Sequence, residues 1–229
     1  MSGAFNNARG KPVLDAMVEA IAREKGYLSD IDGRIGDGDH GVNMHKGFSK
    51  FASVTEGRDI SLSEGLSELG NILLSEIGGS MGPIYGTIFM SMGEACDGAE
   101  EIDAPLFLSM LEKARDELYD IVQARPGDKT LVDVLASAID AFSAAAGDST
   151  FAEALSVMAA AAERGRDSTK DMIAKYGRAR PLGERSRGVI DAGAASCCLL
   201  LSAMASAMSQ IMRGKNHDFK SNVKPELKS

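Results

Sequence analysis

Apolar residues recur at spacings of three and four positions along most of the chain, which is typical of amphipathic helices that bury one face. No convincing run alternates between apolar and polar positions, as a half-buried strand would. Proline, glycine and capping-box signals divide the pattern into eight segments. We therefore expect helices over about residues 12–25, 42–52, 61–77, 84–96, 105–121, 131–142, 150–176 and 189–212.

Short connections between consecutive helices favour antiparallel neighbours, so we expect an all-α, up-and-down bundle or barrel of about eight helices. In this arrangement the odd-numbered connections lie at one end of the molecule and the even-numbered connections lie at the other. The even-numbered connections are ordinary polar turns. The odd-numbered ones carry unusual sequences rich in aspartate, glycine or arginine, near residues 32–41, 78–82, 125–129 and 177–188. The sequence thus predicts a site at one end, provided that the helix count is right.

Composition agrees with a helical domain that is large enough to bury a full core. The 229 residues are 44% hydrophobic and only 5% aromatic, and Trp is absent. Nothing inside the chain has the composition of a linker. We therefore expect one domain over residues 1–229, with a polar tail from about Arg213.

The charge balance argues against nucleic acid and membranes as partners. A formal net charge of −8 at pH 7 opposes both a phosphate backbone and an anionic membrane surface. Serines interrupt the most apolar stretch, residues 194–208, so we expect no membrane span, and the N-terminus shows no signal sequence. The three cysteines form neither a CxxC motif nor a disulfide framework, which indicates a reducing cytoplasm.

The first odd-numbered connection has the character of a divalent-cation site. Asp32, Asp37 and Asp39 stand at positions i, i+5 and i+7 among glycines that allow the backbone to fold back tightly. Three carboxylates are hard oxygen ligands that suit Mg²⁺ or Ca²⁺, whereas zinc usually takes His or Cys. A solvated turn whose carboxylates cap the next helix is the structural alternative, and the spacing alone does not choose between the two. The clustering of unusual loops at one end favours the metal site.

Two other interpretations of this segment fit less well. Residues 36–41 formally satisfy G-x-G-x-x-G, but no β-branched run precedes them and two aspartates would repel a pyrophosphate. An EF-hand would need oxygen ligands at every second residue and a Glu at the twelfth position. Counted from Asp37, the fifth position is Gly41 and the twelfth is Phe48.

The other odd-numbered connections offer groups that suit phosphate. Backbone N–H groups of Gly79, Ser80 and Met81 precede a predicted helix, whose dipole favours an anion there. The connection at residues 177–188 supplies four arginines, which are planar donors to phosphate or carboxylate. A plain glycine turn, and arginines that are solvated or paired with Glu184, are the structural alternatives. His40 and Asp191 are also candidate ligand contacts. Their structural alternatives are, respectively, a hydrogen-bonded histidine without a ligand and a carboxylate that stabilises the following helix.

Four motifs in order give the chain a family resemblance. Asp32 with residues 35–44, then residues 78–82, 126–130 and 177–186, resemble the nucleotide-binding L subunit, or C-terminal domain, of dihydroxyacetone kinases. The resemblance covers about residues 10–212. It implies an eight-helix barrel that holds ADP or ATP at one end through two Mg²⁺ ions.

The resemblance also implies roles for particular residues. Asp32, Asp37 and Asp39 match the family's metal ligands, and Arg178 would also stabilise charge during phosphoryl transfer. The positions that match its nucleotide and phosphate contacts are His40, Gly41, Asn43, Ser80, Met81, Leu131, Arg178, Asp191, Ala192 and Gly193. Three positions depart from the family pattern: Leu131 replaces a frequent Met, Ala192 replaces a common Pro, and Val122 replaces a Gly that some members have.

The function that the resemblance implies is a glycerone-kinase-type phosphotransferase subunit for dihydroxyacetone or a related short ketose. A separate K-type subunit would carry the ketose through a histidine, because no such domain fits in this chain. A phosphotransferase-system phosphoryl donor and a homodimer are further partners that the resemblance allows. The alternatives are a fatty-acid kinase-like component, an ADP-loaded regulatory module that docks on a transcription factor, and a purely structural bundle.

Overall fold

The structure is a computed structural model that describes residues 3–221, with side chains to residue 214. Its α-helices are α1 (Lys11–Ile35), α2 (His40–Thr55), α3 (Leu62–Glu76), α4 (Met81–Ala95), α5 (Ala104–Ile121), α6 (Leu131–Ala146), α7 (Phe151–Ser168) and α8 (Ala192–Ser221). Three short 3₁₀ helices are η1 (Asn7–Arg9), η2 (Thr169–Asp171) and η3 (Arg180–Ser186). The two-residue strands β1 (Phe5–Asn6) and β2 (Glu101–Ile102), which the pattern did not predict, pair antiparallel.

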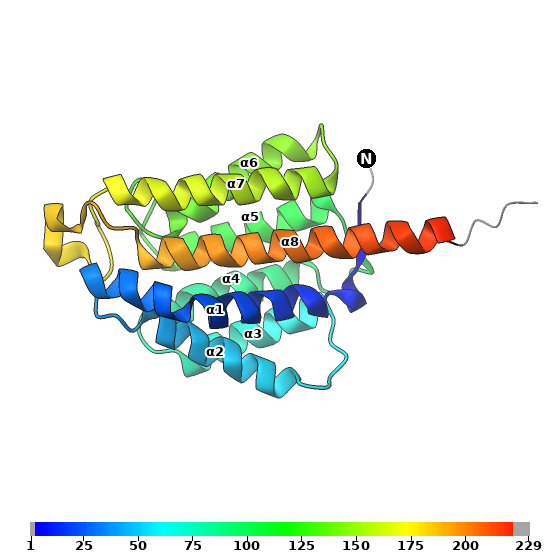
Figure 1. The fold of residues 1–229 in the computed structure, drawn as a ribbon, viewed down its shortest axis with the longest axis horizontal. Helices are drawn as coiled ribbons and strands as arrows, with labels where there is room; N and C mark the ends of the chain where they lie inside the picture. The colour runs from blue at the N-terminus through cyan, green and yellow to red at the C-terminus, as the bar shows by residue number, and fades with distance from the viewer. Residues whose placement is uncertain (1–2, 222–229) are drawn as a thin grey trace, which may run out of the picture.

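The eight helices of the described residues form a closed ring. Each helix contacts the next one in the sequence, and α8 packs against α1. Figure 1 shows the helices lying roughly along the long axis, with η3 and the end of α1 at the opposite end from the N-terminus. The predicted all-α, up-and-down barrel is therefore confirmed.

Local signals define most of the helix starts. The predicted capping boxes Ser61/Glu64 and Thr150/Glu153 both form, and a third box, Thr130/Asp133, begins α6. In each box the hydroxyl and the carboxylate satisfy backbone N–H groups that lack partners in the helix. These caps explain why α3, α6 and α7 begin where the sequence predicts.

The apolar faces of the helices meet in one large core inside the ring. Within this core, Phe107, Phe142 and Phe151 lie toward the end of the barrel that is far from the odd-numbered connections. Their ring centroids are 5.3 to 6.0 Å apart. Their helices, α5, α6 and α7, are thereby held together. The core leaves the other end of the ring free to form a cavity.

The largest errors in the predicted helix boundaries concern α1, α7 and α8. Helix α1 continues past Gly26 to Ile35, because Leu28 and Ile31 extend its buried face, so Asp32 lies on the last helical turn. Helix α7 ends at Ser168 instead of about residue 176, and there the hydroxyls of Ser168 and Thr169 donate to carbonyl oxygens three residues back. Helix α8 begins at Ala192 and continues beyond residue 212 to Ser221, and residues 222–229 of the predicted tail lie outside the described residues.

The expectation that no segment reaches the length of a membrane span was also wrong. Among the described residues, Ala192–Gly214 of α8 is long and apolar enough to cross a membrane, judged by length and composition alone. However, 72% of its most apolar window is buried inside the protein, as in the core helix of a barrel.

Candidate functional site

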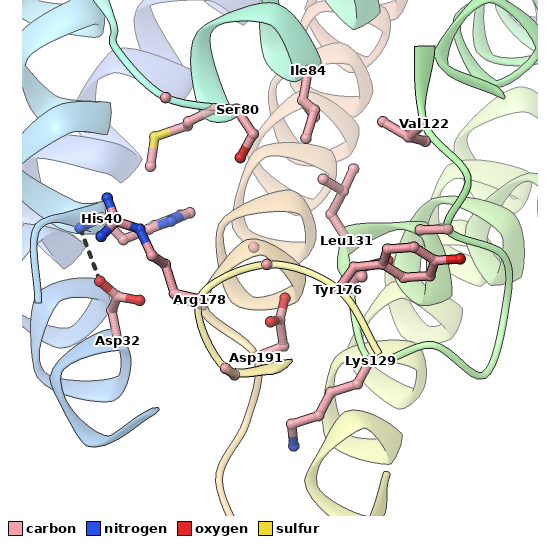
Figure 2. A pocket seen from close by; sticks show the side chains of 18 of the residues that line it. Asp32, His40, Ser80, Ile84, Val122, Lys129, Leu131, Tyr176, Arg178 and Asp191 are labelled. Carbon is pink, nitrogen blue, oxygen red and sulfur yellow. Dashed lines mark hydrogen bonds between the residues drawn. The ribbon is translucent and has the colours of Figure 1, made fainter. Parts of the chain in front are cut away.

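A cavity of about 730 Å³ opens at the end of the barrel where the odd-numbered connections meet. Its lining comes from all four of them, as the parity of the helices predicted: residues between 32 and 43, 78 and 85, 118 and 132, and 176 and 193. Figure 2 shows these segments arranged around the open space. Residues far apart in sequence thus share one site.

One side of the cavity carries the three predicted carboxylates. Oxygens of Asp32, Asp37 and Asp39 lie within 4.8 Å of one another, which suits a shared divalent cation. Burial raises the pKa of Asp32, and the charges of the other two raise it further, against hydrogen bonds from the backbone N–H groups of His40 and Gly38. Gly38 has φ of +78°, a conformation that favours glycine. The donor set fits Mg²⁺, and the role of metal ligand remains a prediction.

Arg178 reaches this acidic cluster from the connection between α7 and α8. Its Nη1 lies 2.5 Å from Oδ2 of Asp37, and both side chains are partly in solvent. In Figure 2 the side chain of Arg178 extends across the cavity mouth toward Asp32 and His40. The pairing of an arginine with Glu184 that we considered is made by Arg187, at 3.1 Å. Arg178 is therefore free of Glu184 and placed where an anion bound beside the carboxylates would meet it.

His40 begins α2, but its imidazole points into the barrel. Its Nε2 lies 2.8 Å from Oγ of Ser196 on α8, and that hydroxyl lies 2.6 Å from the hydroxyl of Tyr85 on α4. Ser196 also donates to the carbonyl oxygen of Gly193. Burial lowers the pKa of His40 to about 4, so the ring is neutral at pH 7. The ring thus joins three helices, which is the structural role considered above, and it also lines the cavity, so its role as a nucleotide contact stays a prediction.

Two of the other predicted contacts on this side differ in position. Asn43 lines the cavity, one turn into α2. Gly41 is absent from the lining and packs against α1, where a Cβ would collide with the carbonyl oxygen of Lys25. Its lack of a side chain lets α1 and α2 approach closely.

The N-terminus of α4 forms the next wall. Ser80 is the N-cap of α4 but makes no side-chain capping bond, so the amides of the first turn, which begins with Met81, lack that partner. Gly79 has φ of +70° before this turn. Both Ser80 and Met81 line the cavity, as predicted. An anion in the cavity would therefore meet N–H groups and the positive end of the helix dipole.

The wall opposite the carboxylates is apolar. Ile84, Val122, Leu131 and Tyr176 face the cavity there (Figure 2). Leu131 is 7% exposed at the start of α6. Val122, where some family members have glycine, takes space in this wall. The surface suits a flat apolar group such as a nucleotide base.

The Asp191–Gly193 turn closes the cavity next to α8. Oδ2 of Asp191 accepts a hydrogen bond of 2.8 Å from the N–H of Ala194, so this carboxylate caps the helix, the structural alternative. Burial raises its pKa to about 6. Ala192 and Gly193 line the cavity beside it, and the turn forms without the proline that the family commonly has. The same carboxylate also faces the open space in Figure 2.

Sequence reasoning assigned no role to Lys129, which lines the cavity and is 1% exposed. Its Nζ donates to two carbonyl oxygens, those of Thr169 and Val189. No sequence signal identifies such a bond, because every residue offers a backbone carbonyl. Ser196 and Tyr85, which hold His40, were missed for a similar reason: they lie more than 40 residues from it.

The fold and the cavity define a class of protein: an eight-helix barrel with an acidic, glycine-lined site at one end. The chain belongs to the family of the DAK2 domain, whose family model matches residues 34–206. The predicted resemblance is thereby confirmed.

Named relatives support the assignment. The ADP-binding subunit DhaL of a PEP-dependent dihydroxyacetone kinase from Listeria innocua is 37% identical over 194 residues, which cover 83% of this chain and 91% of that protein. The subunit of the same name from Escherichia coli is 33% identical over 196 residues, covering 84% and 92%. A D-erythrulose kinase from Mycolicibacterium smegmatis is 33% identical over 210 residues, which cover 89% of this chain but only 36% of that kinase.

A solved structure shares the fold. The crystal structure of the dihydroxyacetone kinase of C. freundii aligns with a TM-score of 0.68 at 21% identity, covering 88% of this chain and 34% of that one. The structure of that kinase in complex with AMP-PNP and Mg²⁺ aligns with a TM-score of 0.63 at 20% identity. This chain thus spans about a third of the longer kinase.

Proposed function

We propose that this chain is the Mg²⁺-dependent, ADP- or ATP-binding subunit of a kinase for dihydroxyacetone or a related short ketose, with residues 1–229 as one nucleotide-binding domain. The observation that carries the proposal is the meeting of three carboxylates, the N-terminus of α4 and an apolar wall in one cavity. These are the surfaces that the metal, phosphate and base parts of a nucleotide need. Relatives named as ADP-binding subunits and as erythrulose kinases favour a ketose over the lipid alternative.

Each wall has its own task in this function. Asp32, Asp37 and Asp39 would hold the metal, which we propose to be two Mg²⁺ ions. Bound Mg²⁺ neutralises the charge of the phosphates. The amides at Ser80 and Met81 would donate to phosphate oxygens. Phosphoryl transfer needs positioning and charge stabilisation more than covalent chemistry.

Arg178 would stabilise charge during transfer. Its guanidinium lies beside the acidic cluster and offers several N–H donors. Asn43, Leu131 and the Asp191–Gly193 turn would contact the rest of the nucleotide. His40 lines the cavity while bonded to Ser196, whereas Gly41 would act from behind these contacts, since it packs on α1.

The ketose would be supplied by a separate K-type subunit in the cytoplasm. The chain covers about a third of the erythrulose kinase relative, so the remainder of that protein is available for substrate binding. Two relatives are named as PEP-dependent, which favours ADP that stays bound and is rephosphorylated by a phosphotransferase-system partner. A pull-down from native cells would distinguish a ketose-binding subunit from a lipid-binding subunit or a transcription factor.

Calorimetry with ADP, in the presence and absence of Mg²⁺, tests the proposal. The wild-type chain should bind ADP only with Mg²⁺, and binding should raise its melting temperature. Asp37→Asn should weaken binding by about tenfold or more with unchanged helicity, because one charged metal ligand is lost. The control is Asp30→Asn, which removes the same charge from an exposed position on α1. A wild-type chain without Mg²⁺-dependent affinity would end the proposal, whereas unchanged affinity in D37N would end only this ligand assignment.

A further inference from the structure

Lys129 combines two unfavourable features immediately before α6. Its backbone has φ of +60°, the only positive value at a non-glycine residue among the described residues. Its side chain is 1% exposed, although lysine is almost never fully buried without partners. Burial lowers its pKa, against the charge of Asp191, which raises it. A residue held in this state must make contacts that offset both features.

The contacts of the ammonium group lie at the two ends of one connection. Nζ lies 2.5 Å from the carbonyl oxygen of Thr169, where α7 gives way to η2. It lies 2.6 Å from the carbonyl oxygen of Val189, two residues before Asp191. Between these two carbonyls runs the connection that includes Arg178. Lys129 thus bonds both ends of that connection to the start of α6.

Other bonds close the same base of the connection. The N–H of Gly188 donates to the carbonyl oxygen of Lys170 at 2.7 Å, and the N–H of Asp191 donates to Oγ1 of Thr169 at 3.1 Å. Two charged groups also bond there: the ammonium of Lys129, which is buried, and the guanidinium of Arg187, which is half exposed and donates to the carbonyl oxygen of Asp171. Charge-assisted hydrogen bonds are about twice as strong as neutral ones. Lys129 is therefore the buried one of the two charged groups at the base of the connection, and it bonds both ends at once.

Apolar packing contributes little to holding this connection. Most of its apolar side chains join a small cluster beside the main core: Ala174 and Ala179 are buried with Ile35 of α1, and Leu182 and Val189 pack against them. Tyr176 is the residue of the connection that packs against the main core. A segment with few apolar contacts opens at low free energy unless polar bonds hold it. The orientation of the connection therefore depends on its polar contacts.

Lys129 acts from beneath the site. In Figure 2 its side chain runs away from the cavity centre, whereas the carboxylate of Asp191 points into the open space. The ammonium group is thus directed at the loop base and not at the position of a ligand.

We propose that Lys129 is the positioning residue of the nucleotide site: its ammonium holds the two ends of the 169–189 connection together, so that Arg178 and Asp191 face the cavity before the nucleotide arrives. The inference rests on the proposed function for the identity of the ligand. Without this clamp the connection would open, and the apparent nucleotide affinity would fall in proportion to the fraction of molecules that remain closed.

The test compares Lys129→Met with Lys175→Met. Lys175 belongs to the same connection and pairs with Asp128 at 2.6 Å, but its side chain is 61% exposed, so its loss should matter little. K129M should weaken Mg²⁺-dependent ADP binding by roughly tenfold to a hundredfold, whereas K175M should bind like the wild type. In ligand-free hydrogen exchange, K129M should lose protection at residues 170–191 while α3 and α4 stay protected. The exchange measurement tests the clamp even if ADP is the wrong ligand.

Several outcomes would overturn the proposal. One is a K129M chain that melts earlier but binds ADP with wild-type affinity, which would show a role in stability alone. Another is an equal loss of protection over the whole barrel. If K129M does not fold, Lys129→Gln decides the question. The glutamine side chain is shorter and uncharged, so it should hold the two carbonyls more weakly. The K129Q chain should therefore exchange faster at residues 170–191 and bind ADP several-fold more weakly. Wild-type exchange and affinity in K129Q would refute the clamp.

Discussion

Replacing Arg178 with glutamine should change metal binding and nucleotide binding in opposite directions. In the ligand-free protein the guanidinium lies 2.5 Å from Oδ2 of Asp37, so it competes with a cation for this carboxylate. A cation that binds Asp37 should therefore weaken its pairing with Arg178. Bound phosphate, in contrast, would gain hydrogen bonds from the same guanidinium.

The geometry sets the size of each effect. The two side chains are 70% and 37% exposed, so solvent and salt weaken their attraction. Loss of such a pair should tighten the binding of Mn²⁺ or Mg²⁺ alone by about twofold to fivefold. Loss of a charge-assisted bond to phosphate should weaken the binding of ADP with Mg²⁺ by about tenfold to a hundredfold.

Isothermal titration with the metal alone, and then with ADP at saturating Mg²⁺, measures both effects. Arg180→Gln is the matched control, because it removes the same charge two residues further along the chain. The side chain of Arg180 is exposed and does not line the cavity. The gain in metal affinity should shrink as salt is raised. An R178Q chain that binds both metal and nucleotide more weakly, or that behaves like R180Q, would refute the competition between Arg178 and the cation.

Two further predictions concern stability in the absence of ligand. Gly41→Ala should destabilise the fold by about 1–3 kcal/mol in urea unfolding, because its Cβ would collide with the carbonyl oxygen of Lys25. The control is Gly26→Ala, which has open space around it and should stabilise α1. Equal effects of the two substitutions would argue against close packing at Gly41. Burial raises the pKa of Asp191 to about 6, above its value of about 3.9 in an unfolded chain, so the folded protein binds the proton more tightly and loses stability as pH rises from about 4 to 6. Asp191→Asn keeps an N-cap residue for α8. The variant should therefore match the stability of the wild type near pH 4 and exceed it at pH 7. A constant difference in stability between the two across this range would contradict a raised pKa at Asp191.

The elements of the fold could be predicted because their signals are local. Helix periodicity and the capping boxes at Ser61 and Thr150 act over a few residues, so the sequence alone contains them. The boundary of α1 was missed because Gly26 lowers helix propensity locally, whereas the burial of Leu28 and Ile31 against other helices outweighs it. Local propensity decides a boundary only where tertiary packing does not.

The site was partly predictable for a topological reason. Once the helices are counted and assumed to alternate in direction, the odd-numbered connections must meet at one end, and the cavity lies there. Residues within one loop, such as Asp37 and Asp39, could therefore be grouped from the sequence.

The partners of individual side chains could not be predicted in this way. The bond from His40 to Ser196 joins positions 156 residues apart, and the two carbonyl oxygens that hold Lys129 look like any others in the sequence. Sequence by itself determined the helices, their order and the end at which the site lies, because those follow from short-range periodicity and alternation. Only the tertiary structure decided which side chains face the cavity and which lie beneath it, because that depends on how distant helices pack and exclude water.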